Sequence, residues 1–326
     1  MAEQLLHGAD VVARLEQMGT LGVTQIALEP KPPYDHSLSA NPTDLEAKMP
    51  DSHRAAVIGF YDTHPINEDE ILQKLSSRGL DLGTITEQEL KDFDQDHYGG
   101  VEAVEALAKA AGISTGQHVL DVGSGMGGPA RWLAHKFGCR VTGLDLTDSR
   151  VKGAGRLTER VGLASLVKFV QGDATRMPLP TATFDALVSQ EVWCHIPEKE
   201  ALIAECARVL KPSGKFAFTD IMVVGDFSSA DEQQLARGMK IPRPASLGQY
   251  EALAAKNRLT ISGTTDLSSE WNTILVGRLE MYRSLRDTTV AKFGEQRFHE
   301  YDQAYEYFVG LFTRGLLGGY RVAGDA

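Results

Sequence analysis

Cysteine and long apolar runs are scarce in this sequence, and their scarcity excludes several classes of protein. The three cysteines, Cys139, Cys194 and Cys206, lie far apart without C-x-x-C spacing, so neither a disulfide framework nor a metal site is expected. A reducing cytoplasm is therefore the expected location. No stretch of about 18 apolar residues occurs, and the amino terminus lacks a basic segment, so neither a membrane span nor a signal peptide is expected.

Basic residues are also in the minority. Lys and Arg number 33 against 44 Asp and Glu, which gives a net charge of −11. Binding to a phosphate backbone needs a face rich in Lys and Arg, and no basic run occurs, so nucleic acid is not an expected partner. The 326 residues are enough for one large α/β domain with an extension, or for two domains.

Residues 1–95 are predicted to form a helical extension that contains a proline-rich loop. The loop is EPKPPYDHSLSANPTD, at 29–44, where four prolines prevent regular structure. Asn67 and Thr86 each stand three residues before a Glu, which predicts two capping boxes. The stretch 81–105 carries eight acids against one lysine, which predicts a solvated face or one that attracts a cationic ligand.

Residues 96–326 are predicted to form the main domain, in which short apolar strands alternate with helices. This alternation predicts βαβ units and a parallel sheet. The predicted strands are HVLDV, CRVTGLDL, LVKFVQ, FDALVSQ, KFAFTDIM, ISGTTDL and GYRVAG. The predicted helices lie near 101–112, 130–137, 148–161, 198–210 and 245–256, and a long helical stretch is expected over 270–313.

The turn after the first strand, LDVGSGMGGP, fits two cofactor templates. In both, glycine lets the chain turn tightly and lets a ligand approach the backbone. A glycine-rich turn without a ligand is the third interpretation. The dinucleotide template G-x-G-x-x-G is matched by Gly123, Gly125 and Gly128. The template D-x-G-x-G-x-G, typical of S-adenosylmethionine enzymes, is matched by Asp121, Gly123, Gly125 and Gly127.

Three carboxylates bear on this choice. Asp121 would repel an anionic diphosphate, whereas a cofactor with an ammonium and a sulfonium would be attracted. Asp145 lies 22 residues after Gly123, a spacing that suits a carboxylate on ribose hydroxyls in either template. Asp173 follows the third strand, where it can accept the amino group of adenine. Together the three favour S-adenosylmethionine over a nicotinamide nucleotide.

Five ordered segments resemble the class I S-adenosylmethionine-dependent methyltransferases: LDVGSGMGG, GLDLT, QGDATRMPLP, FDALVSQEVWCHIP and LKPSGKFAFTD. A closer similarity, through ECARVLKPSG and SLGQY, is to sarcosine and dimethylglycine N-methyltransferases. The resemblance covers about residues 93–326 and leaves residues 1 to about 90 without a role. It implies a Rossmann-like, doubly wound, mostly parallel seven-stranded sheet with an antiparallel last strand.

The resemblance also implies which residues hold the cofactor. Asp121 and the backbone of the glycine turn would bind the methionine amino group and the ribose, Asp145 the ribose hydroxyls, and Gln190 the methionyl part. The adenine would pack on Leu146, and Asp173 would read its edge. The implied cofactor-binding residues are Asp121, Gly123, Ser124, Gly125, Gly127, Asp145, Leu146, Asp173, Ala174 and Gln190.

The catalytic candidates lie beside the expected acceptor. His195 either accepts a substrate proton or caps the helix that starts at Pro197, and Trp193 either lines the acceptor site or packs in the core. Tyr98, with His97, belongs either to a lid over the cofactor or to an ordinary turn before Gly99.

Three further residues are weaker candidates for the acceptor site. Arg243 is the candidate for an acceptor carboxylate, with a surface position as the alternative. Tyr250 and Trp271 line the pocket or pack in the core.

The expected function is therefore in-line methyl transfer to a small molecule. An amine such as sarcosine or dimethylglycine is the first expectation, and S-adenosylhomocysteine is the product. Methylation of carbon, oxygen or sulfur on another metabolite is the alternative, because a fold does not determine the acceptor. A NAD-dependent oxidoreductase and a non-catalytic cofactor-binding protein are further alternatives. The long helices either cover the site or build a homodimer.

Overall fold

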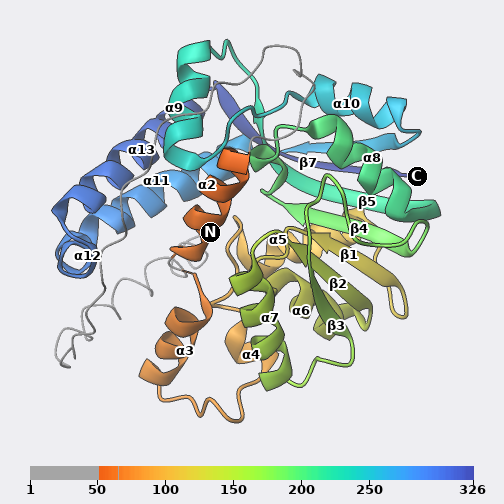
Figure 1. The fold of residues 1–326 in the computed structure, drawn as a ribbon, viewed down its shortest axis with the longest axis horizontal. Helices are drawn as coiled ribbons and strands as arrows, with labels where there is room; N and C mark the ends of the chain where they lie inside the picture. Colours follow the sequence, from red (N-terminus) through yellow and green to blue (C-terminus); the bar gives the residue numbers. More distant parts are fainter. Residues whose placement is uncertain (1–50, 65) are drawn as a thin grey trace, which may run out of the picture.

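A seven-stranded sheet organises the molecule (Figure 1). The computed structural model describes residues 51–64 and 66–326, so the predicted loop at 29–44 lies outside the described residues. In the strand order β3-β2-β1-β4-β5-β7-β6, only β7 runs antiparallel to its neighbours, which confirms the predicted sheet. The strands are β1 (His118–Val122), β2 (Arg140–Asp145), β3 (Val167–Gln171), β4 (Phe184–Gln190), β5 (Leu210–Val223), β6 (Thr260–Asp266) and β7 (Leu317–Asp325).

The strand order reverses between β1 and β4, and this reversal positions the functional crevice. β1 pairs in parallel with β2 on one side and with β4 on the other. In open α/β sheets, ligands bind outside the carboxyl ends of the strands at such a point. The loops that follow β1, β2, β3 and β4 therefore surround one site.

Most helices between the strands begin and end where local sequence signals predict. Pro129 lies in the first turn of α6, and Gly138 ends it with a left-handed φ of 66°, both as predicted. Ser246 and Gln249 form a capping box, so the motif SLGQY is the start of α10. The confirmed helices are α5 (Gly100–Ala110), α6 (Gly128–Phe137), α7 (Asp148–Arg160), α8 (Lys199–Val209) and α10 (Leu247–Lys256).

Two helical features differ from the prediction. α9 (Ser229–Met239) was not predicted, although Ser228 and Asp231 form a capping box at its start. The break before α13 is at Gly294, whose backbone, with φ 87° and ψ 157°, is far from helical. The stretch 270–313, predicted as one helical region, is accordingly three helices: α11 (Ser268–Ser284), α12 (Arg286–Phe293) and α13 (Glu295–Thr313).

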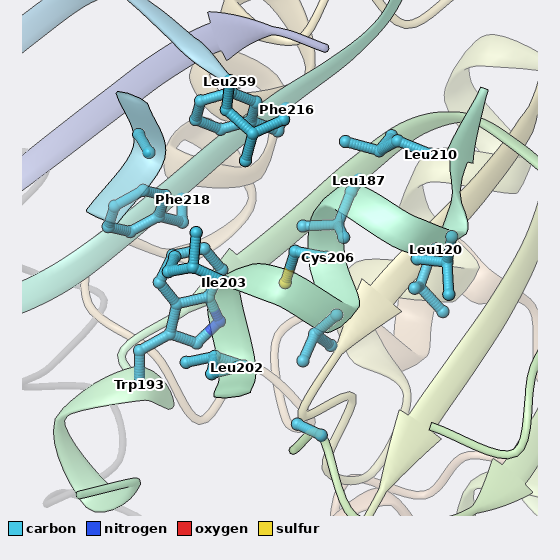
Figure 2. Packing of buried hydrophobic residues seen from close by; sticks show 14 of the residues in the cluster. Leu120, Leu187, Trp193, Leu202, Ile203, Cys206, Leu210, Phe216, Phe218 and Leu259 are labelled. Carbon is cyan, nitrogen blue, oxygen red and sulfur yellow. The ribbon is translucent and has the colours of Figure 1, made fainter. Parts of the chain in front are cut away.

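Apolar side chains fill both faces of the sheet. α8 and α10 cover one face, where Trp193 stacks on Phe218 with 3.9 Å between ring centroids, close to Cys206 (Figure 2). α5 and α6 cover the other face, over Val119 and Ala186. Burial of these side chains provides the main driving force for folding and holds the strand ends as a rigid platform for the site.

The described part of the amino-terminal extension packs onto the main domain (Figure 1). Its helices are α2 (Asp51–Asp62), α3 (Glu68–Ser77) and α4 (Glu87–Leu90). Ile71 and Leu90 are fully buried in one cluster with Met126 of the glycine turn and Leu157 of α7. The extension thus supports the turn that follows β1. No helix in the described part of the chain is long and apolar enough to cross a membrane.

The predicted capping boxes are only partly present. Thr86 and Glu89 form a complete one, as predicted. Asn67 accepts the Glu70 backbone N–H at 3.1 Å, but the Glu70 carboxylate pairs with Lys292 of α12 instead of returning to Asn67. The reciprocal half of that prediction is wrong because a cation from a distant helix competes for the carboxylate.

The expectation that the acidic stretch 81–105 is a solvated face is wrong at two of its acids. Glu87 and Asp94 are buried around Arg131 of α6, which is itself fully buried. The Arg131 guanidinium donates to Asp94 at 2.7 Å and to the Met126 carbonyl at 2.8 Å. A buried cation requires partners, and these acids supply them while they anchor the glycine turn.

Candidate functional site

A cavity of about 2550 Å³ opens at the carboxyl ends of β1, β2 and β4. Most of the residues predicted for the site line this cavity, although they come from segments far apart in the sequence. Those that line it are Asp121, Gly123, Ser124, Gly125, Asp145, Leu146, Asp173, Ala174, Gln190, His195, His97 and Tyr98. Those that do not are Gly127, Trp193, Arg243, Tyr250 and Trp271.

The glycine turn has the left-handed backbone that its sequence suggests. Gly123 has a φ of 78°, and a Cβ built on it would collide with the Val192 methyl groups. Gly127 has a φ of 81°, and a Cβ there would lie 2.5 Å from the Phe169 ring. Gly127 is therefore required by packing beneath the turn, whereas Gly123, Ser124 and Gly125 face the cavity.

Asp121 is a buried carboxylate that lacks a complete set of partners. It is 3% exposed, and its Oδ2 accepts no hydrogen bond from any described residue. Burial and the nearby Asp145 raise the pKa of Asp121 to about 7. The Oγ of Ser124 is likewise buried without a partner. An unpaired buried carboxylate costs free energy, which a cationic ligand group would recover.

Two more carboxylates continue along the ends of the strands. Asp145, at the end of β2, accepts the backbone N–H groups of Gly125 and Thr147, each at 2.9 Å. Asp173, after β3, accepts from Thr175 with one oxygen and is ion-paired with Arg54 of α2 through the other. Asp121, Asp145 and Asp173 thus form a row of acceptors that can serve an ammonium, a ribose and an adenine.

A chain of hydrogen-bonded side chains lies at the carboxyl end of β4. His97 contacts Gln95 Oε1 through Nε2 at 2.8 Å and the Gln190 amide nitrogen through Nδ1 at 3.0 Å. Because Gln95 Oε1 can only accept, Nε2 carries the proton and Nδ1 accepts from Gln190, so the Tyr98 carbonyl, 3.2 Å from Nδ1, receives no proton from the neutral ring. Burial lowers the pKa of His97 to about 4, so the ring is neutral at pH 7. Gln190 is therefore held in place at the carboxyl end of β4.

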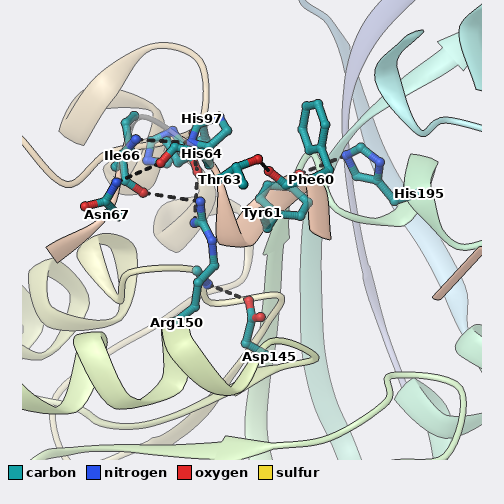
Figure 3. Close-up of polar contacts among 12 residues, drawn as sticks. Phe60, Tyr61, Thr63, His64, Ile66, Asn67, His97, Asp145, Arg150 and His195 are labelled. Atoms are coloured by element: carbon teal, nitrogen blue, oxygen red, sulfur yellow. Dashed lines mark hydrogen bonds and ion pairs between the residues drawn. The ribbon is translucent and has the colours of Figure 1, made fainter. Parts of the chain in front are cut away.

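His195 lies in the short 3₁₀ turn after β4 and faces Tyr61 of α2 (Figure 3). Its Nδ1 lies 2.9 Å from the Lys240 carbonyl, which only accepts, so Nδ1 bears the proton. Its Nε2 accepts the Tyr61 hydroxyl at 2.9 Å. Burial lowers the pKa of His195 to about 4 and keeps the ring neutral. The Tyr61 hydroxyl and His195 Nε2 thus form a hydrogen-bonded pair along which a proton can move, but a pKa of about 4 makes His195 a weaker base than the value near 7 that suits a proton acceptor.

His195 does not cap the following helix, as one interpretation of the sequence suggested. α8 begins at Lys199 with Glu198 as its N-cap residue, and no side chain caps it. Both ring nitrogens of His195 are instead engaged by Tyr61 and Lys240.

Four candidates for the acceptor site lie elsewhere. Trp193, Tyr250 and Trp271 are buried in the core, and the Tyr250 hydroxyl donates to Asp220 at 2.6 Å. Arg243 is on the surface, where it pairs with Glu232 at 2.9 Å. The alternative interpretation therefore holds for all four: the three aromatic residues pack in the core, and Arg243 lies on the surface. Tyr98 lines the cavity beside Arg278.

Residues that α2 and the loop after β4 bring to the site are not indicated by any sequence pattern. His53 donates to the His195 carbonyl at 2.9 Å, and Arg54 and Tyr61 reach Asp173 and His195. No spacing rule connects α2 to residues more than 100 positions away. Glu191, next to Gln190 in the SQE stretch, has the positive φ of 52° that often marks a functional site. Among the described residues, no group of three or more metal-ligating side chains is present.

Comparison with known proteins agrees with this geometry. Residues 120–218 match the methyltransferase domain family. The sterol 24-C-methyltransferase of Pneumocystis carinii is 33% identical over 64% of this chain and 59% of its own length. The sarcosine/dimethylglycine N-methyltransferase of Halorhodospira halochloris is 35% identical over 39% of this chain and 44% of its own length. Phosphoethanolamine N-methyltransferase 2 of Haemonchus contortus superposes with a TM-score of 0.65 at 22% identity, over 82% of this chain and 59% of that one.

The matched methyltransferase domain and the order of the strands agree with the predicted resemblance to the class I S-adenosylmethionine-dependent methyltransferases. Within that class its sequence is similar both to sterol C-methyltransferases and to the sarcosine/dimethylglycine group. The chain spans less than two thirds of the length of the sterol methyltransferases that it matches.

Proposed function

We propose that the protein transfers a methyl group from S-adenosylmethionine to a small molecule and releases S-adenosylhomocysteine. The observation that carries this proposal is the unpartnered Oδ2 of Asp121, buried between the glycine turn and Asp145. The cofactor's ammonium would complete the hydrogen bonds of Asp121 and balance its charge. A dinucleotide would instead bring diphosphate oxygens toward that carboxylate, which is unfavourable.

The remaining cofactor roles follow from the row of carboxylates. Asp145 would accept from the ribose hydroxyls, since each of its oxygens has used only one lone pair on the backbone. Leu146 and Ala174 would contact the adenine, and Asp173 would accept its amino group. Ser124 Oγ lacks a partner and would bond to the methionine part. When bound, the cofactor supplies an activated methyl group.

The acceptor would enter the wide part of the cavity, between α2, α11 and α13. The protein's task in methyl transfer is to hold the acceptor atom about 3–3.5 Å from the methyl carbon, in line with the leaving sulfur. Tyr61 and His195 would receive the proton that an amine loses, because His195 Nε2 is unprotonated and already accepts from Tyr61. A nitrogen acceptor is our first candidate, and the similarity to the sarcosine/dimethylglycine enzyme supports it.

Methylation at carbon is the second candidate. The sterol methyltransferase relatives support it, as does a cavity of about 2550 Å³, far more space than dimethylglycine fills. Tyr98, Tyr301, Tyr305 and Phe308 line this space, so it also accommodates an apolar acceptor.

Calorimetry with S-adenosylhomocysteine tests the cofactor assignment. We expect micromolar binding and a loss of about 10- to 100-fold in Asp145→Ala, because two charge-assisted hydrogen bonds are removed. Asp148→Ala is the matched control, since Asp148 is exposed and pairs only with Lys152. No binding at millimolar ligand, or tight binding of NADH instead, would reject the proposal. A panel of amines, phenols, thiols and isoprenoids with labelled cofactor would then identify the methylated atom.

A further inference from the structure

Arg278 of α11 lines the cavity. Its Nη2 donates to the His97 carbonyl at 3.0 Å, and the His97 ring in turn contacts Gln190. The guanidinium lies over the Tyr98 ring, 4.8 Å from its centroid, and its charge acts on the Tyr305 hydroxyl. These contacts orient Arg278 from two sides and connect it through His97 to Gln190, one of the predicted cofactor-binding residues.

No carboxylate of a described residue lies within 4.0 Å of the Arg278 guanidinium. Two carboxyl groups, those of Asp96 and Glu191, interact electrostatically with the Arg278 guanidinium from a longer distance. Asp96 is already ion-paired with Arg150 at 3.0 Å. Glu191 accepts from the Tyr98 N–H and the Thr219 hydroxyl, and burial raises its pKa to about 8, so it is mostly protonated at pH 7. Among the described residues, no ionised carboxylate is therefore paired directly with the Arg278 guanidinium.

The guanidinium also retains donors. Arginine has five N–H groups in a planar fork, and the His97 carbonyl takes one of them. A fork with free N–H groups and a positive charge suits a carboxylate or a phosphate better than any neutral group. Arg243, the cation predicted from the sequence for this purpose, is exposed and outside the cavity.

We propose that Arg278 is an anion-binding residue of this cavity and takes the carboxylate or phosphate group of the methyl acceptor. The proposal rests on the proposed methyltransferase function, and it identifies the acceptor as an anionic amine rather than a neutral one. The methionine part of the cofactor also carries a carboxylate, which is a second group that Arg278 could bind. The two sources are separated by the experiment.

The first arm of the test measures cofactor binding. Calorimetry compares S-adenosylhomocysteine with methylthioadenosine, which lacks the amino-acid part, on the wild type, Arg278→Met and Arg278→Lys. Arg283→Met is the matched control, because Arg283 lies on the same helix, pairs with Asp302 and does not line the cavity. If the acceptor is the source of the anion, none of these variants changes either affinity. If the cofactor is the source, Arg278→Met weakens only S-adenosylhomocysteine, which keeps the anion site but overturns its assignment to the acceptor.

The second arm measures anionic acceptors on the protein loaded with S-adenosylhomocysteine. Dimethylglycine and phosphoethanolamine, which carry a carboxylate or a phosphate, are the anionic probes, and dimethylglycinamide and ethanolamine, which are neutral at that position, are their neutral counterparts. We expect at least one anionic probe to bind the wild type and to lose about 10- to 100-fold in affinity in Arg278→Met, with partial recovery in Arg278→Lys. The neutral probes should not respond to the substitution.

Two further results would overturn the proposal. One is equal weakening of S-adenosylhomocysteine and methylthioadenosine in Arg278→Met, which would show that Arg278 only supports the segment at His97. The other is a wild type that binds neither anionic probe while Arg278→Met leaves both nucleosides unaffected. Failure of the proposed function itself would look different, since the wild type would then bind no S-adenosylhomocysteine.

Discussion

Asp121 is the residue whose protonation is most directly linked to cofactor binding. Its pKa of about 7 means that it is mostly protonated at pH 6 and mostly ionised at pH 8. The ammonium of S-adenosylhomocysteine favours the ionised form, so affinity should rise by about tenfold over this range. Calorimetry at pH 6, 7 and 8 measures the change, and Asp121→Asn should bind weakly at every pH.

Methylthioadenosine is the control for this prediction because it has no ammonium group. It should bind the wild type with the same affinity at all three pH values. A similar rise for both ligands would mean that another group is responsible.

Tyr61 is the second residue with a defined role in the proposed chemistry. Tyr61→Phe keeps the ring that packs beneath Arg150 but removes the hydroxyl that donates to His195. For an amine acceptor, kcat should fall by about 10²- to 10⁴-fold, while the affinity for S-adenosylhomocysteine stays within about twofold. Steady-state kinetics with the acceptor identified by the labelled panel measures both effects.

Tyr307→Phe provides the comparison for Tyr61→Phe. Tyr307 also loses a hydroxyl hydrogen bond, to Asp231, but it does not line the cavity. Equal kcat values for the two variants would exclude a proton-accepting role for Tyr61.

Individual site residues could be predicted only where a strand end places them. Asp121, Asp145 and Gln190 follow apolar strands, so the parallel pattern predicts that they meet at one edge. Arg278 and Tyr61 lie on helices whose packing against the sheet depends on tertiary contacts, and no local pattern indicates which way they face. Trp193 follows Gln190 closely in sequence, yet its ring packs under the sheet because Phe218 provides an apolar surface there.

At the scale of elements, the glycine turn links packing with the shape of the site. Gly127→Ala would require a left-handed φ from alanine and would press a methyl group against Phe169. These effects together should lower the free energy of unfolding by about 2–4 kcal/mol. Urea denaturation measures the change.

Gly155→Ala is the matched substitution in α7. A Cβ there meets nothing within 4 Å, so alanine should stabilise the helix by about 0.5–1 kcal/mol. If Gly127→Ala changed stability as little as Gly155→Ala, the turn would be less tightly packed than the structure indicates.

The elements themselves were mostly predictable because the strands are short, apolar and separated by clear stop signals. α9 was missed although Ser228 and Asp231 mark its start, since its sequence SADEQQLARGM has a single fully buried side chain, Leu235, and so lacks an apolar stripe. The division of 270–313 was missed because Gly294 is not distinguished in the sequence from two other glycines of the stretch, Gly277 and Gly310, which lie inside helices. The burial of Glu87 and Asp94 was missed because their partner, Arg131, lies on another helix.

At the scale of the whole molecule, stability should depend on pH through Glu191. Burial raises its pKa from 4.5 to about 8, so the folded state holds a proton that the unfolded state releases. The contribution of Glu191 to the free energy of unfolding is therefore greatest at low pH. It falls as pH rises toward 8, by up to about 1.4 kcal/mol per pH unit. Glu191→Gln, whose amide resembles the protonated acid, should lose less stability than the wild type between pH 6.5 and 8.

Denaturant midpoints of the two proteins at pH 6.5, 7.2 and 8 test this prediction. His97 and His195 have pKa values lowered to about 4, so their contribution is lost as pH falls below about 6.5, outside this range. Parallel pH profiles for the wild type and Glu191→Gln would show that Glu191 is already ionised when folded.

Helix α2 contacts both ends of the cavity at once. Arg54 and Tyr61 are seven residues apart, about two helical turns, and they reach the adenine end and the acceptor end respectively. Rotation of one side chain releases only one of the two contacts, and the other contact still holds the helix. The two ends of the cavity therefore cannot open separately by movement of α2. Spent nucleoside and methylated product would thus depart through a single opening event, and the lifetime of the closed helix would set an upper bound on turnover.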